Sequence, residues 1–230
     1  MRKYTTLLFD ADMTLFDFDA AERDAFGIVM ADYGIQLSEG DFERYSRINK
    51  ELWSQFGRGE ITKEYLQDNR FRMFFDTLDT PPSIDGKTVN ASFLEALADC
   101  SQLFDGAEEL CRALSGKYEM YIMTNGISRT QRKRFRASPI LGYFRDIFVS
   151  EDAGAPKPRR EYFDYVFSRI GEDKRKSSVI IGDSLEHDIA GGIAAGIDTV
   201  WYNARGERGT ADIVPTVTVH SYAELLQLLL

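Results

Sequence analysis

Cysteine is scarce in this sequence, which has only Cys100 and Cys111 among its 230 residues. Both lie in segments with a helical pattern, so we expect two reduced thiols in the core and no disulfide framework. No stretch approaches the roughly 20 consecutive apolar residues that a membrane-spanning helix needs. The first apolar run is too short for a signal peptide and is interrupted at Asp10. These absences predict a cytoplasmic protein with no membrane partner.

Basic residues are outnumbered by acidic ones, 28 against 37, which gives a formal net charge of −9. No basic block interrupts this pattern, so nucleic acid is not an expected partner, because a polyanion is bound by clustered positive charge. A small anionic substrate remains compatible with the sequence, since a bound cation and a few local Lys or Arg residues can outweigh a distant field. The hydrophobic content of 43% is enough for a sizeable core.

Short strand-like runs alternate with helical patterns over most of the chain. The predicted strands are 4–9, 119–123, 147–150, 178–181 and 199–202, with a weaker one at 216–220. The predicted helices among them are 107–114, 128–138, 160–170 and 186–195. This alternation predicts an α/β fold, a Rossmann-like parallel sheet with helices on both faces. In such sheets, ligands bind beyond the carboxyl ends of the strands.

The interval from residue 18 to residue 100 breaks the alternation. It shows only helical periodicity, over 19–33, 38–56, 62–78 and 90–98. Ser38 with Asp41, and Thr62 with Tyr65, are typical of helix starts. We therefore expect an all-helical domain over 18–100, inserted after the first strand, and a core domain formed by 1–17 and 101–230.

Two carboxylates follow the first predicted strand. Asp10 and Asp12 are spaced i, i+2, which on an extended backbone directs both side chains to the same side. Like charges held this close repel unless a cation or a shared proton offsets them. The ordinary alternative is a capping aspartate followed by an acidic turn.

Two further polar motifs contain groups suited to an anion. Thr124, Asn125 and Gly126 close the second strand, where a hydroxyl and a close backbone approach can serve a phosphate. Lys157 lies between two prolines, which suits a fixed point charge. Each has an ordinary alternative, a polar turn for the first motif and a solvated loop lysine for the second.

A fourth motif follows the strand at 178–181. Gly182 and Asp183 end this strand, and Asp188 comes five residues after Asp183, near the start of a helix. Hard cations such as Mg²⁺ prefer carboxylate oxygens, and Asp10 and Asp183 on neighbouring strand ends would supply two of them. Asp188 is either part of this metal site or an acidic residue favoured by the helix dipole.

In this order, the motifs resemble the signature of the haloacid dehalogenase superfamily. That signature is D-x-D-x-T, then Ser or Thr, then Lys, then G-D-x-x-x-x-D. The matching residues are Asp10, Asp12, Thr14, Thr124, Lys157, Asp183 and Asp188. The resemblance covers essentially the whole chain, including a helical cap inserted after the first motif. It implies a phosphomonoester hydrolase that uses Mg²⁺ and an aspartyl-phosphate intermediate.

The resemblance also implies roles for individual residues. Asp10 is the expected nucleophile, and Asp12 is the expected acid and base. The expected metal ligands are the carboxylates of Asp10 and Asp183 and the backbone carbonyl of Asp12, with Asp188 behind them. Thr124 and the backbone N–H of Asn125 are expected to hold the phosphoryl oxygens. Lys157 is expected to offset the negative charge on Asp10 and on the phosphate.

Asp12 separates the branches of this superfamily. True dehalogenases lack the second acid, because displacing a halide requires no proton donor, and the ATPases carry Thr at this position. A phosphatase is therefore the main interpretation, with a phosphomutase as a lesser one. The alternatives are a phosphatase of small sugar phosphates or phosphoglycolate, and a non-enzymatic scaffold that binds a phospholigand.

Three stretches resemble the bacterial nucleoside 5'-monophosphatases that prefer pyrimidine nucleotides. They read DADMTLFDFD, INKELWSQFGRGEIT and DNRF. This resemblance implies a nucleoside monophosphate as the small phosphate-ester substrate, with its flat base stacked on aromatic rings and read by amides. The candidate specificity residues are Phe16, Phe18, Asn49, Trp53, Asn69 and Arg70. The alternative is that the aromatic residues form the cap's own core.

Overall fold

A computed structural model describes residues 4–230, which form two compact units. The core unit contains residues up to Phe18 and the segment Ser101–Leu230, and the helical unit contains Asp19–Cys100. These bounds lie within one residue of the expected domain boundaries. Among the described residues, no helix has both the length and the apolar character that crossing a bilayer requires.

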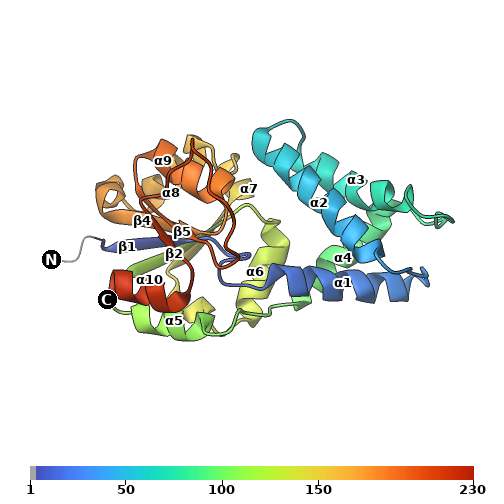
Figure 1. Ribbon diagram of the computed structural model, residues 1–230, viewed down its shortest axis with the longest axis horizontal. Coiled ribbons are helices and arrows are strands. Elements are labelled where there is room, and N and C mark those ends of the chain that lie inside the picture. The colour runs from blue at the N-terminus through green and yellow to red at the C-terminus, as the bar shows by residue number, and fades with distance from the viewer. Residues whose placement is uncertain (1–3) are drawn as a thin grey trace. The chain divides into compact units, whose positions relative to one another are not determined.

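The core unit is built on a six-stranded sheet in the order β3-β2-β1-β4-β5-β6. Every neighbouring pair of strands is parallel. The strands are β1 (Thr6–Phe9), β2 (Glu119–Thr124), β3 (Asp146–Val149), β4 (Ser178–Gly182), β5 (Asp198–Tyr202) and β6 (Val217–Val219). Figure 1 shows β1, β2 and β4 side by side in the middle of this sheet. The α/β fold predicted from the alternating pattern is thus confirmed.

Helices cover both faces of the sheet, as the side chains of β1 illustrate. Leu7 and Phe9 pack on one face with apolar residues of α5 (Ala107–Leu114), α6 (Ser128–Ala137) and α10 (Tyr222–Leu229). Leu8 points to the other face and packs with α8 (Arg160–Ile170) and α9 (Ala190–Ala195). Alternating side chains of one fully buried strand therefore support two separate hydrophobic clusters.

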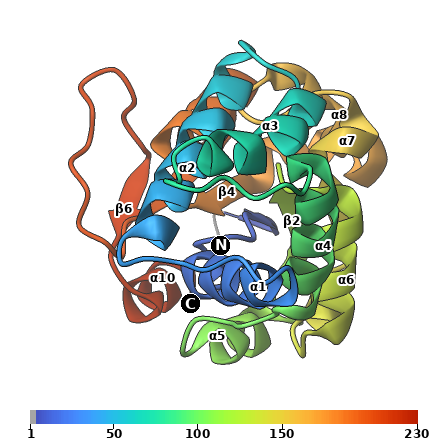
Figure 2. The same ribbon diagram turned by 90° about the vertical axis from the view of Figure 1, so that its right-hand side faces the viewer.

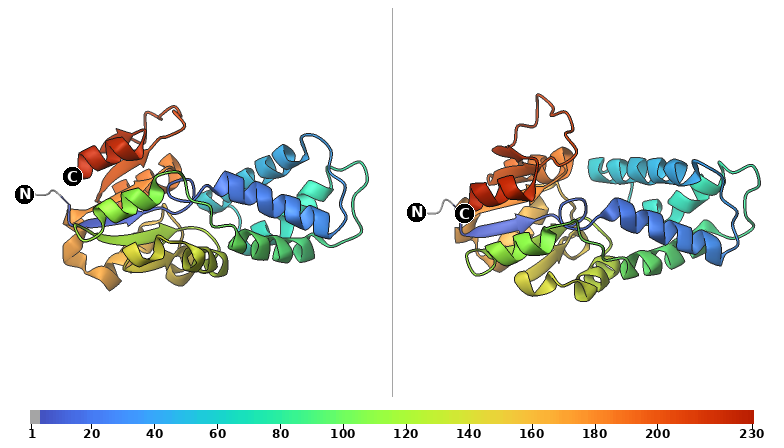
Figure 3. Two further views of the ribbon diagram at one scale, coloured as in Figure 1. Left: turned by 90° about the horizontal axis from the view of Figure 1, so that it is seen from below. Right: turned by 60° about the horizontal axis from the view of Figure 1, so that its bottom comes forward.

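Some elements differ from the sequence prediction. Helix α10, the last helix of the chain in Figure 3, was not predicted. Its leucines pack in the hydrophobic cluster on one face of the sheet. The helix predicted at 186–195 is divided into a wide π turn, Leu185–Ile189, and the short α9. The N–H groups of Asp188 and Ile189 both donate to the carbonyl of Ser184, so the turn holds one residue more than an α-helical turn. Short helices also occur at Leu141–Tyr143, Ser150–Ala153 and Glu172–Ser177.

The helical unit consists of four helices (Figure 2). They are α1 (Phe18–Asp32), whose first residue belongs to the core unit, α2 (Asp41–Arg58), α3 (Lys63–Phe75) and α4 (Gly86–Asp99). Thr62 caps α3 by accepting a hydrogen bond from the N–H of Tyr65, at 3.0 Å, as expected from the sequence. Aromatic rings fill the interior, where Tyr45 lies 4.7 Å from Phe26 and 4.9 Å from Phe71, measured between ring centroids.

Candidate active site

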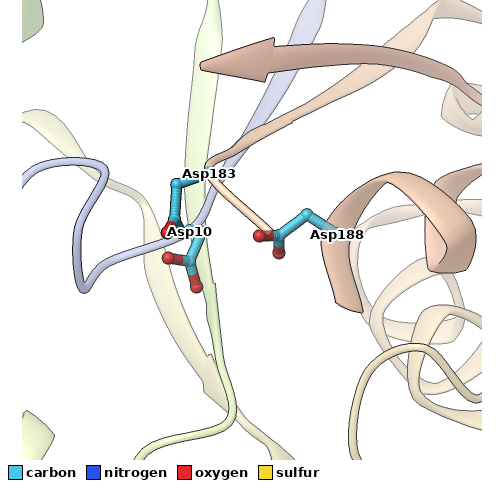
Figure 4. A group of neighbouring side chains, drawn as sticks. All are labelled: Asp10, Asp183 and Asp188. Atoms are coloured by element: carbon cyan, nitrogen blue, oxygen red, sulfur yellow. The ribbon is translucent and has the colours of Figure 1, made fainter. Parts of the chain in front are cut away.

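The predicted site residues meet at the carboxyl ends of three adjacent strands. Asp10 follows β1, Thr124 ends β2 and Asp183 follows β4. The order β2-β1-β4 brings these three positions together, since parallel strands end at the same edge. Figure 4 shows Asp10 and Asp183 at neighbouring strand ends, with Asp188 directed toward them from the following turn.

A tight turn after β1 sets the positions of the first motif. The N–H groups of Leu15 and Phe16 both donate to the carbonyl of Ala11, at 2.9 Å. Met13 adopts the left-handed region with a φ of 62°, which is uncommon for a residue with a side chain. The buried Thr14 hydroxyl accepts from the N–H of Asp183, at 3.1 Å. The turn after β1 is thereby joined to the end of β4.

Lys157 connects two of the acidic residues. Its Nζ donates to Asp10 Oδ1 at 2.5 Å, to Asp188 Oδ1 at 2.6 Å and to the carbonyl of Met123 at 2.7 Å. The residue is 2% exposed, so all three bonds lie in a desolvated interior. The expectation of a fixed point charge matches this geometry, whereas a solvated loop lysine does not.

The side chain of Asn125 holds the backbone of Lys157. Its Nδ2 donates to the carbonyl of Lys157 at 2.9 Å, and its Oδ1 accepts from the N–H of the same residue at 2.8 Å. This paired contact fixes the lysine backbone from outside its own loop. The sequence pointed only to the backbone of Asn125 as a phosphate contact, and this role of its side chain was missed.

The electrostatics of this group follow from two acids sharing one ammonium. Burial raises the pKa of Asp10 to about 7, with Lys157 opposing the rise and Asp188 and Asp12 adding to it. Burial by itself would lower the pKa of Lys157, but the charges of Asp10 and Asp188 outweigh burial, and its pKa is raised. Lys157 therefore stays protonated, while its positive charge compensates only part of the unfavourable burial of the Asp10 carboxylate.

Three carboxylates form a candidate cation site. Asp10, Asp183 and Asp188 each offer an oxygen, and these oxygens lie within 4.8 Å of one another. Burial, followed by the charges of Asp10 and Asp188, raises the pKa of Asp183 well above its ordinary value. A divalent cation would offset this repulsion, and a donor set made only of oxygens fits a hard cation such as Mg²⁺. The position of Asp188 is close enough for its oxygen to join the other two, and its place behind the ligands stays a prediction.

Two neighbouring residues shape the cation site. A Cβ atom at Gly182 would lie 2.3 Å from Cγ of Asp188, so only glycine permits the close approach of that carboxylate. The indole Nε1 of Trp201 donates to the carbonyl of Asp183 at 2.7 Å and holds the end of β4. Trp201 was not identified from the sequence, because its strand pattern alone accounts for an aromatic residue there.

Thr124 has the surroundings of an anion-binding residue. Its N–H donates to the buried Tyr162 hydroxyl at 3.0 Å, which anchors the strand end. Its Oγ1 accepts from the N–H of Gly126 at 3.0 Å and from Nε2 of Gln131 at 2.8 Å. Two donors at this oxygen leave the hydroxyl's own hydrogen for another acceptor, such as a phosphoryl oxygen.

Asp12 is held by two residues of α6 that the sequence did not reveal. Nη1 of Arg134 donates to Asp12 Oδ1, and Nε2 of Gln131 donates to Asp12 Oδ2 at 2.8 Å. Their three-residue spacing on a helix was a usable signal, because it places both on one face. The sequence analysis assigned no role to either residue.

A cavity of about 300 Å³ adjoins the site within the core unit. Its lining includes Asp183 and the apolar or aromatic side chains of Met13, Phe104 and Tyr202. Arg205 also lines it and donates to the sulfur of Met13, at 3.7 Å. The cavity thus combines an apolar wall with a cation next to the acidic cluster.

Three of the candidate specificity residues have structural positions that correct their assignment. Phe16 is fully buried in the hydrophobic cluster of the core unit. Asn49 and Arg70 are each 1% exposed and lie inside the helical unit, where Arg70 Nη1 donates to Asn49 Oδ1 at 3.3 Å. Side chains committed to such interior contacts are not displayed to a substrate, so we assign these three a structural role.

The other three candidates are partly exposed. Phe18 and Trp53 are both half-buried, and Trp53 packs edge-on against Phe56 with ring centroids 5.7 Å apart. Asn69 is also half-buried, and its Nδ2 donates to the carbonyl of Tyr65 on the same helix. Phe18, Trp53 and Asn69 therefore stay predictions as specificity residues.

Replacing Arg70 with Met is expected to destabilise the protein by about 3–5 kcal/mol. Arg70 Nε donates to Asn90 Oδ1 at 2.6 Å, and Asn49 connects Arg70 to the buried Glu22. Without the guanidinium, the buried carboxylate of Glu22 would lose a positive charge that compensates it inside the helical unit. Urea denaturation measures the change in unfolding free energy.

The matched control is Arg72→Met, which removes an exposed arginine from the same helix and is expected to change stability by less than about 1 kcal/mol. Adding Glu22→Gln to Arg70→Met should recover part of the loss, because the double variant buries no uncompensated charge. Equal effects of the Arg70 and Arg72 variants would contradict the proposed network.

Comparison with known proteins identifies the family to which this chain belongs. Residues 4–196 match the haloacid dehalogenase-like hydrolase family. The chain is 40% identical over 229 residues to the HAD-hydrolase YfnB of Bacillus subtilis (strain 168), covering 100% of this chain and 97% of YfnB. A crystal structure of YfnB bound to magnesium has a TM-score of 0.92 to this structure, with 98% of each chain covered.

Two further relatives are similarly complete matches. The chain is 37% identical over 227 residues to pyrimidine 5'-nucleotidase YjjG of Escherichia coli (strain K12), covering 99% of this chain and 98% of YjjG. It is 34% identical over 227 residues to pyrimidine 5'-nucleotidase PynA of Streptococcus pneumoniae (strain ATCC BAA-255 / R6), covering 98% of this chain and 95% of PynA. Since the family match and these relatives extend over most or all of the chain, it belongs to the haloacid dehalogenase-like hydrolase family.

Proposed function

We propose that this enzyme is a Mg²⁺-dependent phosphatase that hydrolyses phosphate monoesters through a covalent intermediate on Asp10 and prefers pyrimidine nucleoside 5'-monophosphates. Two contacts support a phosphoryl group next to Asp10. Lys157 donates a hydrogen bond to Asp10 Oδ1, and the hydroxyl of Thr124 has a hydrogen available for a phosphoryl oxygen. Lys157 would offset the charge of both nucleophile and phosphate. Catalysis of this kind rests mainly on positioning and electrostatics.

The cation site has its own part in this proposal. Asp10 and Asp183 would hold Mg²⁺, with Asp188 close enough to join them and the backbone carbonyl of Asp12 as an expected fourth contact. When bound, Mg²⁺ would neutralise part of the charge on the carboxylates and the phosphoryl group. The backbone N–H of Asn125 and the hydroxyl of Thr124 would orient the phosphoryl oxygens from the β2 side.

The observation that carries the phosphatase assignment is the second carboxylate, Asp12, next to the nucleophile. An alkoxide leaving from phosphate needs a proton, which a carboxylic acid can supply, and an attacking water needs a base, which the resulting carboxylate can supply. A halide leaving group needs neither. The charge of Asp12 contributes to the raised pKa of Asp10, as expected for two acids in one site.

The preference for pyrimidine nucleotides is supported by two relatives aligned over nearly their full lengths. YjjG and PynA are both pyrimidine 5'-nucleotidases. The cavity beside Asp183 supports an organic leaving group in the core unit, since Tyr202 and Phe104 give it an aromatic lining. A base of a nucleotide is flat and matches such surfaces.

Phosphate release from a panel of esters tests this proposal. We expect kcat/KM for UMP, dUMP and dTMP to exceed that for hexose phosphates and phosphoglycolate by about 10-fold or more. A chelator should abolish release from every ester, and added Mg²⁺ should restore it, because the acidic cluster needs a cation to accept another anion. Purine monophosphates in the same assay measure the contribution of the base.

Different failures of this experiment reject different parts of the proposal. Equal rates on sugar phosphates would reject the nucleotide preference and favour a sugar-phosphate phosphatase. Release that continues in the presence of chelator would reject the metal site. Retained ligand binding with no release from any ester would favour a phospholigand-binding scaffold over an enzyme.

A further inference from the structure

Both carboxylate oxygens of Asp12 are occupied by donors from α6. Arg134 Nη1 donates to Oδ1, and Gln131 Nε2 donates to Oδ2 at 2.8 Å. Arg134 Nη1 also donates to Gln131 Oε1 at 3.0 Å, which directs the amide NH₂ of Gln131 toward Asp12. The three side chains form a closed ring of hydrogen bonds, so the orientation of Asp12 depends on both partners.

The guanidinium of Arg134 is buried and held by its neighbours in one place. Its side chain is fully buried, with the guanidinium carbon 4.5 Å from the ring centroid of Phe16 and 6.0 Å from that of Phe18. Burying a guanidinium is unfavourable unless a carboxylate compensates it, and Asp12 is the carboxylate at Nη1. The rings of Phe16 and Phe18 add favourable cation–π contacts to the guanidinium beside Asp12.

Gln131 ties Asp12 to the candidate phosphate position. Its Nε2 donates to Asp12 Oδ2 and also to Thr124 Oγ1, with both distances at 2.8 Å. One nitrogen bridging two oxygens limits how far apart those oxygens can move. Gly126 makes room for this bridge, because a Cβ there would lie 2.6 Å from Cγ of Gln131. The oxygen of Asp12 is therefore held next to the hydroxyl that we assign to phosphate.

We propose that Arg134 and Gln131 are positioning residues that hold Asp12 in the orientation required for proton transfer to the leaving oxygen. This inference rests on the proposed phosphatase function. As the bond from an Asp10 oxygen to phosphorus forms and the bond from phosphorus to the leaving oxygen breaks, Asp12 gives its proton to that oxygen. In the second step, Asp12 takes a proton from water as water displaces Asp10 from phosphorus.

The test compares two leaving groups in Arg134→Gln. For UMP, whose alkoxide needs a proton, kcat/KM is expected to fall by about 10- to 100-fold, part of the effect of an acid catalyst. For p-nitrophenyl phosphate, whose phenolate leaves without a proton, kcat/KM should change by less than about 3-fold. The parameter kcat/KM reports steps up to the first phosphoryl transfer, so it excludes the second role of Asp12 as base.

The control is Arg136→Gln, which makes the same substitution at an exposed position of the same helix and should leave both substrates unchanged. Gln131→Leu provides a second variant that removes no charge, for use if Arg134→Gln does not fold. In an Asp12→Asn background, Arg134→Gln should lower kcat/KM for UMP by less than about 3-fold further, because the residue it positions has lost its acid function.

Equal losses on the two substrates would overturn the inference and leave Arg134 a structural residue. A gain on UMP would also overturn it, since that result means the ring of hydrogen bonds holds Asp12 away from the reaction. Failure of the unaltered enzyme to release phosphate from either ester would instead reject the proposed function.

Discussion

Replacing Asp10 with Asn should abolish phosphate release, with a loss in kcat of at least about 10⁴-fold. In the proposed mechanism Asp10 is the nucleophile, and an amide cannot take that role, so the covalent route would be closed. The substitution also removes one of three acids in the candidate cation site and a partner of Lys157. Steady-state phosphate release, assayed with saturating Mg²⁺, measures the effect.

The fold should survive this change. Asn has nearly the same shape as Asp, and removing one buried charge relieves the repulsion that contributes to the raised pKa of Asp10. We expect the unfolding free energy to stay within about 1 kcal/mol of the unaltered protein. Asp212→Asn is the control, because Asp212 is exposed on the long loop before β6. Substantial residual release by Asp10→Asn would remove Asp10 as the nucleophile.

Replacing Lys157 with Met should both inactivate the enzyme and lower its stability by about 3–5 kcal/mol. Asp10 and Asp188 share this lysine as a buried counter-ion, and the substitution leaves two adjacent carboxylates without it. Urea denaturation in the presence of a chelator measures the loss. Lys176→Met removes an exposed lysine as a control and is expected to have little effect.

Mg²⁺ should restore part of the stability lost in Lys157→Met. A ligand that binds only the folded state stabilises it according to its concentration and affinity, and a cation at the acidic cluster would compensate the charge left by the missing ammonium. The increase in unfolding free energy on adding Mg²⁺ should be larger in the variant than in the unaltered protein. A variant as stable as the unaltered protein in chelator would show that Lys157 does not compensate these acids.

Local patterns in the sequence were sufficient for the architecture of the core unit. The apolar runs that became β1, β2 and β4 are buried on both faces, and such runs flanked by helical periodicity have few alternative folds. The same patterns placed Asp10, Thr124 and Asp183 at strand ends. The carboxyl ends of parallel strands lie at the same edge of a sheet, so these three residues come together once the strands are neighbours. The wide turn at Leu185–Ile189 did not follow, because hydrogen bonds to a single carbonyl decide it.

The sequence by itself thus determined the α/β class, the helical insertion and the residues of the acidic and cationic motifs. Only the tertiary structure decided which polar residues support them. Asp12 forms a hydrogen bond with Arg134, which lies 122 residues later in the sequence, and Asn125 forms one with Lys157, which lies 32 residues later. No local periodicity encodes such pairs, and composition predicts that an arginine in a basic helix is solvated. Arg134 and Arg70 are buried because distant carboxylates, amides and aromatic rings compensate them, which depends on how the chain packs in three dimensions.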